Sequence, residues 1–453
     1  MYNICIIGSS LGWTPKLSVD LMTVFEEPLD IRLVDLDPSV ARLCQEWGET
    51  ATKHYGRQDK FTAYSDRRKA LEGADAVIIT ISTGGLKTME YDIAIPEKYG
   101  IYSTVGDTAG PSGWSRSMRN IPVFEEFARD FEEICPQAFI VNYTNPMSSL
   151  TATLSSLCGN PVVGLCHSYF DFKDVIQRIF KLEDWSPISL QIAGMNHFTW
   201  MTDFKVGRQD GYTMLRELVG TGSLRDVLPA LDDKGQPSRY DLCAELYDTY
   251  GYMPYPGDRH SIEFLSYTLS GDVQRETVTD PRGYDYEIIS GYNVNRTPVS
   301  ERKLGAPRAT KRLTELVSKY PENWPAELKK SEETGSNMVH AFLHNQAMTD
   351  VVNTLNVGQI PGLPLGACVE TYGMIDGSGI RPVVVDKVPE RLLELMRPQA
   401  MNQKWLTEGA VRRDKKLLLQ ALLNDPQCRH LTTRRIQELA EELFAANRPY
   451  ISL

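Results

Sequence analysis

The most constraining feature of this sequence is the order of elements in its first 35 residues, which is strand, glycine turn, helix and strand. An apolar run at residues 4–7 leads into the turn Gly8-Ser9-Ser10-Leu11-Gly12, a segment with helical spacing follows, and a second β-rich run ends at Asp35. A helical crossover joins parallel strands, and this order is that of a nucleotide-binding βαβ unit. The chain is therefore expected to begin as an α/β fold.

The same alternation continues over residues 1–200. The β-rich runs cover residues 4–7, 31–34, 76–81, 139–141 and 162–165, and the helical segments cover residues 15–25, 39–55, 67–71, 117–134 and 170–180. This pattern predicts a doubly wound, Rossmann-like parallel sheet as an NAD-binding domain. After Val206 the texture changes to mixed helices and turn-rich loops, and residues 389–447 are helical. We therefore expect a second α+β, helix-rich domain over residues 201–453, with the functional site between the two.

Composition and charge exclude several classes of protein. With 42% hydrophobic and 24% charged residues, the 453-residue chain has the composition of a globular protein. A net charge of -11 argues against nucleic acid as a partner. No apolar run approaches the ~20 residues that a membrane helix needs. The first residues show no basic region, long hydrophobic segment or small-residue cleavage site, and the eight cysteines form no CxxC pairs, so we expect a cytoplasmic protein whose thiols are mostly buried.

The glycine turn and Asp35 predict a dinucleotide site. Glycines let the backbone approach a pyrophosphate, while a carboxylate at Asp35 would accept hydrogen bonds from the adenosine ribose and so favour NAD over NADP. A second glycine turn follows the run at residues 76–81. The candidate cofactor-binding residues are Gly8, Ser9, Ser10, Gly12, Asp35, Ser82, Gly84 and Gly85. Because serines replace part of the usual glycine pattern, an ordinary tight turn is the alternative.

Two segments follow apolar strands and end in coordinating residues that include Cys166 and His197: Val163-Gly164-Leu165-Cys166-His167-Ser168 and Ile192-Ala193-Gly194-Met195-Asn196-His197. We expect both to emerge at the same edge of the sheet. A thiolate and an imidazole can hold a borderline divalent ion and leave positions open for a substrate. The alternative is that Cys166 is a core thiol and His197 a structural histidine.

Three loops carry further candidate residues. Asn145 lies in Asn142-Tyr143-Thr144-Asn145-Pro146, Asp107 lies in the loop at residues 106–113, and Asp258 lies in Gly257-Asp258-Arg259-His260. Glycines permit unusual backbone geometry, and a single acid in such a loop can reach a ligand. A turn-capping asparagine and solvated surface loops are the alternatives.

Taken together, the motifs resemble family 4 of the glycoside hydrolases, which depends on NAD and a metal. The resemblance spans nearly the whole chain, from the Gly8 loop through residues 106–111, 141–146, 164–168 and 194–197 to 362–364 and Val369-Glu370. It implies a fold like that of lactate and malate dehydrogenases, and homodimers or homotetramers. It also implies hydrolysis of an α-glycoside by transient oxidation at C3, deprotonation at C2 and elimination of the aglycone.

The resemblance also implies roles for individual residues. Cys166 and His197 would bind a divalent ion, usually manganese, that chelates O2 and O3 of the sugar. Asn145 and Asn196 would help to hold the sugar, and Asp107 would be an acid of the substrate site. Asp258 matches the general base at C2 of some α-acting members, whereas other members use a tyrosine. His167 would assist departure of the aglycone.

The metal and acid motifs differ in the substrate that they indicate. Cys166-His167-Ser168-Tyr169 resembles the Cys-His-Ser-Val of α-galactosidases and differs from the versions found in phosphosugar enzymes, which disfavours a 6-phosphosugar. Gly257-Asp258-Arg259-His260, with Glu263-Phe264 after it, is similar to α-galacturonidase-type members, although these usually carry Cys-His-Glu-Val at the metal. Arg259 and His260 would then contact a C6 carboxylate. A loop held by local salt bridges is the alternative for these two residues.

The preferred interpretation is therefore an NAD- and manganese-dependent glycosidase of an α-galacturonide or a related acidic α-glycoside. An α-galactosidase of the same family is the first alternative. A dehydrogenase of the lactate or malate type is the second, because it shares the N-terminal architecture but would accumulate NADH. A non-catalytic NAD-sensing regulator is the third.

Overall fold

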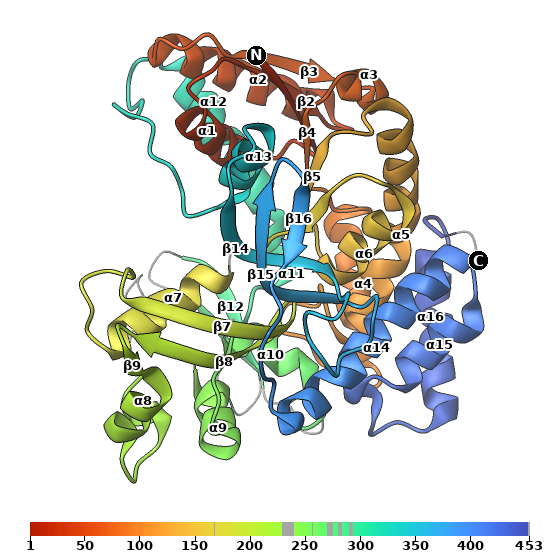
Figure 1. Cartoon of the computed structure of the whole chain (residues 1–453). Helices are drawn as coiled ribbons and strands as arrows, with labels where there is room; N and C mark the ends of the chain where they lie inside the picture. The colour runs from red at the N-terminus through yellow and green to blue at the C-terminus, as the bar shows by residue number, and fades with distance from the viewer. Residues whose placement is uncertain are drawn as a thin grey trace.

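The structure is a computed structural model that describes residues 1–166, 168–228, 240–255, 257–269, 275–279, 283–289, 292 and 294–451 (Figure 1). Within these residues, one mixed 13-stranded sheet runs through the molecule in the order β10-β8-β7-β15-β14-β6-β5-β4-β1-β2-β3, with β16 beside β15 and β9 beside β8. A second, 3-stranded sheet has the order β11-β12-β13.

The N-terminal half supplies the parallel part of the large sheet. Its elements are β1 (Tyr2–Ile7), α1 (Thr14–Val24), β2 (Leu29–Val34), α2 (Pro38–His54), β3 (Lys60–Tyr64), α3 (Arg67–Leu71), β4 (Ala76–Ile79), α4 (Gly85–Glu97), α5 (Gly110–Ile134), β5 (Phe139–Asn142), α6 (Met147–Leu157), β6 (Val162–Gly164) and α7 (Ser168–Ile179). Strands β3-β2-β1-β4-β5-β6 pair in parallel, which is the order of a dinucleotide-binding sheet. The predicted doubly wound α/β fold is confirmed.

Local patterns predicted most of these elements but not all of them. Every predicted strand and helix of this half is present, whereas β3, α4 and α6 were not predicted. One boundary was wrong: α5 begins at Gly110 and not at residue 117, so the loop predicted at 106–113 ends at Ala109. Pro111 is compatible with this start, because N–H groups in the first turn of a helix have no acceptor within the helix and proline has no N–H to leave unpaired.

The second half extends the same sheet with antiparallel strands. Its elements are β7 (Ile188–Met195), β8 (Phe198–Val206), β9 (Gln209–Asp210), α8 (Gly211–Val219), η1 (Leu224–Asp226), α9 (Asp241–Tyr250), β10 (Pro254–Tyr255), α10 (Asp258–Ser261), η2 (Ile262–Phe264), β11 (Arg275–Thr279), β12 (Asp285–Ile289), β13 (Val294–Arg296), α11 (Val299–Lys303), α12 (Gly305–Ser318), α13 (Gly335–Leu343), β14 (Met348–Leu355), β15 (Cys368–Asp376), β16 (Gly379–Pro382), α14 (Glu390–Arg412), α15 (Lys415–Leu423), η3 (Pro426–Cys428) and α16 (Thr433–Asn447). Strand β14 lies between β6 and β15, and β15 pairs with β7. The sheet is therefore continuous across residue 200, which lies in β8, and the division into two domains at that residue stays a prediction.

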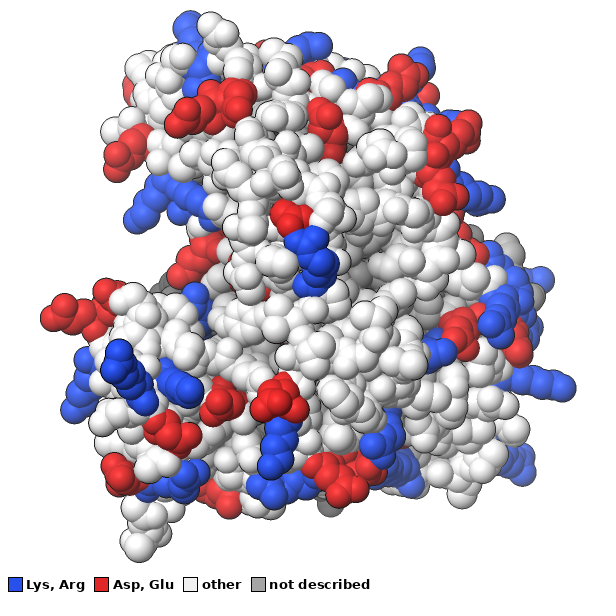
Figure 2. All heavy atoms as spheres, in the orientation of Figure 1, with Lys and Arg blue, Asp and Glu red and all other residues white. Residues whose placement is uncertain are grey.

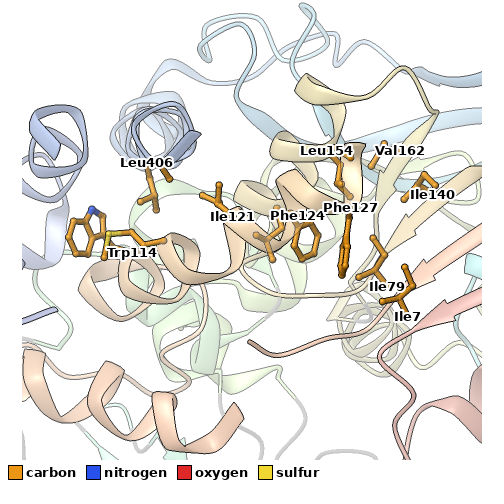
Figure 3. Close-up of a cluster of buried hydrophobic side chains, with 14 of the residues drawn as sticks. Ile7, Ile79, Trp114, Ile121, Phe124, Phe127, Ile140, Leu154, Val162 and Leu406 are labelled. Carbon is orange, nitrogen blue, oxygen red and sulfur yellow. The ribbon is translucent and has the colours of Figure 1, made fainter. Parts of the chain in front are cut away.

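The parallel strands are buried on both faces. Ile4 and Ile6 of β1 pack on one side of the sheet with α1 and α2, whereas Cys5 and Ile7 pack on the other side with α5. Figure 3 shows α5 side chains such as Phe124 filling the space between the strand residues and Leu406 of α14. Each such side chain contributes about 1.5–3 kcal/mol when it is buried. This packing fixes α5 and, with it, the loop that precedes the helix.

In the described part of the chain, charged side chains of both signs lie at the surface (Figure 2), and most cysteine thiols are buried. On the face shown in Figure 2, acidic and basic side chains are interspersed and form no single basic patch. No helix in the described part of the chain combines the length and the apolar character needed to cross a membrane. Seven of the eight cysteines are buried, and Cys166 is the partly exposed one.

Candidate active site

Two adjoining cavities open at the carboxyl ends of the parallel strands. The larger has a volume of about 730 Å³ and the smaller about 320 Å³. Ser10, Thr80 and Ile81 line both cavities, so the two meet above the ends of β1 and β4. Ligands of open α/β sheets bind at this edge.

The larger cavity has the chemistry of a dinucleotide cleft. Gly8 adopts a φ of 91°, and a Cβ atom there would lie 2.6 Å from the carbonyl oxygen of Thr80, so the turn packs against β4 only because residue 8 is glycine. The N–H groups of Gly8 and Ser9 donate to the carbonyl of Val34 at 2.8 and 3.0 Å. These bonds hold the turn beside Asp35, at the end of β2.

Most of the predicted cofactor residues line this cleft. The lining includes Gly8, Ser9, Ser10, Asp35, Ser82 and Gly84. Gly12 and Gly85 are not among the lining residues; Gly12 lies in the turn before α1, and Gly85 is the first residue of α4. Beside Asp35, the Leu36 side chain is fully exposed within the cleft and presents an apolar surface that an adenine ring would cover. The residues present therefore fit a dinucleotide.

The structure brings together the two predicted metal ligands in the smaller cavity. Cys166 follows β6, and His197 closes the hairpin between β7 and β8; the Sγ of Cys166 lies 3.4 Å from the Nε2 of His197. His197 has a φ of 69°, a backbone conformation that residues other than glycine rarely adopt. Such strain persists where the surroundings hold a residue for function.

The second nitrogen of His197 is also held. Its Nδ1 lies 2.9 Å from the Thr108 hydroxyl and 3.9 Å from a carboxylate oxygen of Asp107. A hydrogen bond on the far nitrogen orients a metal-binding imidazole. Burial opposes a charge on His197, but the charge of Cys166, its hydrogen bond and the charge of Asp107 raise the pKa of His197 to about 9. A cysteine sulfur and an imidazole nitrogen so placed fit a divalent ion.

A second grouping of possible metal ligands uses the other side of the same ring. Among the described residues, ligand atoms of Asp107, His197 and His260 lie within 4.8 Å of one another, and the rings of His197 and His260 are 3.9 Å apart. We favour the side of Nε2 and Cys166, because the Thr108 hydroxyl already occupies Nδ1. Asp107 and His260 then line the cavity as polar groups for a substrate.

Asp107 is fixed by its neighbours. It accepts hydrogen bonds from Thr108 Oγ1 at 2.7 Å and from Asn145 Nδ2 at 3.1 Å. Burial alone would raise the pKa of Asp107, but the charges of His197, Arg116 and His260 hold it well below its usual range. Asp107 and Asn145, both predicted, thus lie together with Arg116, which was not predicted. Arg116 belongs to no recognised motif, and its closeness in sequence to residues 110–113 was the one signal that could have indicated it.

A buried carboxylate lies beneath the metal-ligand pair. Glu370 accepts hydrogen bonds from Tyr255 at 2.6 Å, Asn353 at 2.9 Å, Thr199 at 3.0 Å and Asn196 at 3.5 Å. The predicted substrate residue Asn196 therefore contacts Glu370 and is not among the residues lining the cavity.

The sheet register explains this position of Glu370. Gly164, Asn353, Glu370, Gly194 and Thr199 form one row across β6, β14, β15, β7 and β8. The row links the strand that leads to Cys166 with the hairpin that carries His197. The motif Val369-Glu370 marked this residue in the sequence but suggested no role for it.

The predicted base lies beside the cavity and not in its lining. Asp258 is 1% exposed, and its two carboxylate oxygens accept from the backbone N–H groups of Leu242 and Cys243 at 2.8 Å, at the start of α9. Burial raises the pKa of Asp258 to about 7, against these hydrogen bonds. Its predicted role at C2 stays a prediction. His167, the predicted helper for the aglycone, lies outside the described residues.

Two arginines that are not among the residues lining either cavity share one anchor. Arg259 Nη2 donates to the Thr297 hydroxyl at 3.3 Å, and Arg302 Nε donates to the Thr297 carbonyl at 3.1 Å. Arg259 Nε and Arg302 Nη2 are buried and have no hydrogen-bond partner in the described part of the chain. Burial and the charge of Arg259 lower the pKa of Arg302 to about 10. Arg259 was predicted, whereas Arg302, a single residue outside any motif, was not.

Comparisons with known proteins give matches over almost the whole chain. A family model described as "Family 4 glycosyl hydrolase" matches residues 3–182, and one described as "Family 4 glycosyl hydrolase C-terminal domain" matches residues 192–428. The chain is 30% identical to an α-galacturonidase of Thermoanaerobacter italicus, over 98% of this chain and 96% of the relative. It is also 30% identical to an α-galactosidase of Bacillus subtilis, over 97% and 96% of the two chains.

Solved structures of similar fold cover almost the whole chain. A putative glucosidase, lplD, of Bacillus subtilis superposes with a TM-score of 0.82 at 29% identity, over 98% of this chain and 99% of that chain. A 6-phospho-α-glucosidase from gut microorganisms, in complex with NAD and Mn²⁺, gives 0.79 at 18% identity and 99% coverage of both chains. Malate dehydrogenase of Plasmodium falciparum gives 0.51 at 12% identity over 92% and 100%, and is similar in fold alone.

Proposed function

This chain belongs to family 4 of the glycosyl hydrolases and is therefore a glycosidase, and we propose that its substrate is an acidic α-glycoside, an α-galacturonide by preference. We propose that the reaction depends on bound NAD and a divalent metal, manganese by preference. The observation that carries the proposal is the 3.4 Å approach of Cys166 Sγ to His197 Nε2 in a cavity that adjoins the dinucleotide cleft. Two residues far apart in sequence thereby offer a metal site where a nicotinamide ring would end.

The chain's own residues divide the work by position. When bound, the cofactor would supply reversible oxidation at C3 of the sugar, and the metal would supply Lewis-acid stabilisation of charge on the sugar oxygens. Cys166 and His197 would hold the metal, with Thr108 orienting the imidazole. Asp107 and Asn145, already joined by a hydrogen bond, would hold sugar hydroxyls.

Two proton-transfer roles come from the family resemblance. Asp258 is the proposed base at C2, and to act there its carboxylate must exchange at least one of the two backbone N–H bonds that it accepts for the substrate proton. His167 is the proposed helper for departure of the aglycone.

The arginines support an acidic sugar. Two guanidinium groups anchored on Thr297 repel each other, and each keeps one buried nitrogen without a partner among the described residues. Buried polar groups normally have partners, and a carboxylate pairs with guanidinium groups in a bidentate fork. A C6 carboxylate near Arg259 and Arg302 would satisfy these nitrogens.

The neighbouring carboxylates accept hydrogen bonds from other groups, so Arg259 Nε and Arg302 Nη2 still lack an acceptor among the described residues. Asp107 accepts from Thr108 and Asn145, and Glu263 accepts from the Thr104 hydroxyl and the N–H groups of Val105 and Gly106 at 2.7–3.0 Å. An anionic substrate group would therefore pair with the buried nitrogens of Arg259 and Arg302 that these carboxylates leave without a hydrogen bond.

Metal dependence is tested first by substitution. Cys166→Ser should lose high-affinity Mn²⁺ binding and turnover while keeping its fold, because a serine hydroxyl is a far weaker ligand than a thiolate. Cys158→Ser is the matched control, since Cys158 is a thiol that lines neither cavity. Retained Mn²⁺ affinity in Cys166→Ser would refute the metal site.

The reaction itself is tested by isotope incorporation and by cofactor balance. Proton removal at C2 followed by return of a solvent proton predicts deuterium at C2 in product formed in heavy water. Unlabelled product would exclude elimination. Net accumulation of NADH during turnover would instead favour the dehydrogenase alternative.

Substrate class is tested with a panel of nitrophenyl α-galacturonide, α-glucuronide, α-galactoside, α-glucoside and a sulfonated glucoside. An Arg302→Met variant should lose at least about tenfold in kcat/KM on the uronide and little on the galactoside. Arg308→Met, which removes an exposed arginine paired with Glu301, is the control. A wild-type preference for the α-galactoside, the activity named for one relative, would support the first alternative. The homo-oligomeric state and the cytoplasmic location stay predictions.

A further inference from the structure

The last turn of the chain lies against the dinucleotide cleft. Tyr450, which follows α16, lines the same cavity of about 730 Å³ as Gly8 and Asp35, although it comes from the opposite end of the sequence. We propose that this C-terminal turn is part of the cofactor site and that Tyr450 contacts the adenosine half of the bound NAD. The inference rests on the proposed use of NAD.

A fully buried asparagine fixes the position of this turn. The N–H of Tyr450 donates to the carbonyl of Asn447 at 2.8 Å. Asn447 is 0% exposed; its amide donates to Ser115 Oγ at 2.7 Å, and its Oδ1 accepts from Arg119 Nη1 at 3.1 Å and from the Tyr91 hydroxyl at 3.3 Å. These three hydrogen bonds tie the end of α16 to α4 and α5, and the amide also donates to the Leu443 carbonyl within α16 at 2.9 Å.

The same network also holds the second glycine turn, at residues 82–85, whose Thr83 lines the cleft as well. Arg119 forms a buried ion pair with Asp92, and the Nε of Arg119 donates to the carbonyl of Thr83 at 3.0 Å. Such a pair is poor evidence for stability, because desolvation can cancel the Coulombic attraction. Here it sets the distance between Thr83 and the C-terminal turn, and both line the cleft. The network therefore fixes two walls of the site at once.

The chemistry of this end of the cleft suits an adenine ring. Leu36 is fully exposed beside Asp35, and Val123 and Phe127 of α5 line the cleft together with Tyr450. A flat aromatic base is bound by apolar and aromatic surfaces of this kind. Tyr450 is not among the residues that line the smaller cavity, where the nicotinamide end would meet the metal ligands. These positions assign Tyr450 to the adenosine half.

The test compares NAD with ADP-ribose, which has the same adenosine, pyrophosphate and second ribose and lacks only the nicotinamide ring. Affinities of NAD and of ADP-ribose are measured by calorimetry for the wild type, Tyr450→Ala and Tyr450→Phe. Loss of one aromatic contact in Tyr450→Ala should lower the affinities for both ligands by the same factor, about tenfold. Tyr450→Phe, which keeps the ring, should lower both affinities by less than about twofold. Mn²⁺ affinity and the melting temperature without ligand should match the wild type. Tyr267→Ala, at an exposed tyrosine that lines neither cavity, is the control.

Each remaining outcome would count against the inference. Unchanged affinity of Tyr450→Ala for both ligands would exclude the contact. A loss confined to NAD would place the contact at the nicotinamide end and overturn the assignment. Failure of the wild type to bind NAD would overturn the cofactor proposal itself, and this differs from a defect seen only in the variant.

Discussion

Removing the charge of Glu370 should weaken both the fold and the metal site. Glu370→Gln keeps the size of the side chain but replaces one acceptor oxygen with a donor, in a place where four donors converge. A hydrogen bond to a buried charged group contributes about 1.5–3 kcal/mol. Thr199 and Asn353 each have a second acceptor, the carbonyls of Met195 and Gly164. We therefore expect a loss of about 2–4 kcal/mol in the free energy of unfolding.

The same substitution loosens the hairpin that carries His197, because Asn196 and Thr199 on either side of it both contact Glu370. Loss of a residue that supports a metal ligand reduces metal affinity about 10–100-fold. We expect the lower end of that range for Mn²⁺, because neither hydrogen bond is made by His197 itself.

Urea unfolding measures the first effect, and a Mn²⁺ titration followed by electron paramagnetic resonance measures the second. Asp59→Asn is the control: Asp59 is a buried carboxylate that accepts from Leu29 N at 2.9 Å, at the far edge of the sheet. It should lose stability and bind Mn²⁺ normally. If Glu370→Gln is less stable but binds Mn²⁺ like the wild type, the positioning role is wrong. If its stability is unchanged as well, the reasoning about the buried network fails.

Three further predictions concern other parts of the molecule. In Gly113→Ala a new Cβ would lie 2.3 Å from the backbone of Thr108, so we expect at least about tenfold lower Mn²⁺ affinity. Gly159→Ala, whose Cβ would meet only Glu132 Oε1 at an ordinary contact distance of 3.8 Å, should bind Mn²⁺ normally. Burial raises the pKa of Asp425 to about 7, so its contribution to stability is present in acid and is lost as the pH rises from about 4 through about 7. Asp425→Asn should therefore reduce the change in unfolding free energy between about pH 5 and about pH 8 by up to a few kcal/mol. An unchanged pH dependence of the unfolding free energy would contradict this prediction. Asp35→Ala should abolish the preference for NAD over NADP in binding assays, and a preserved preference would show that another residue selects the cofactor.

Short-range patterns in the sequence predicted most of the parallel half of the fold, although not β3, α4 or α6. The apolar run that became β1, the glycine turn at Gly8 and the acid at Asp35 act through neighbouring residues, and their spacing is readable directly. The pairing of Cys166 with His197 was also predicted, from the expectation that both follow strands at one edge of the sheet. That expectation was incomplete, because β14 and β15 lie between β6 and β7. The two ligands meet only through the register of these two strands, which come from the second half of the chain.

Other features were decided by tertiary structure alone. Glu370, Arg302 and Tyr450 reach the two cavities or their surroundings from separate parts of the chain, and none of them belongs to a periodic pattern that would mark its neighbours in space. Asp258, which the sequence placed in a loop near the substrate, caps α9 because that helix happens to begin beside it. Local sequence sets helices, strands and turns through contacts a few residues apart. Which side chains then face a common cavity depends on how distant strands and helices pack, and that information is spread over the whole chain.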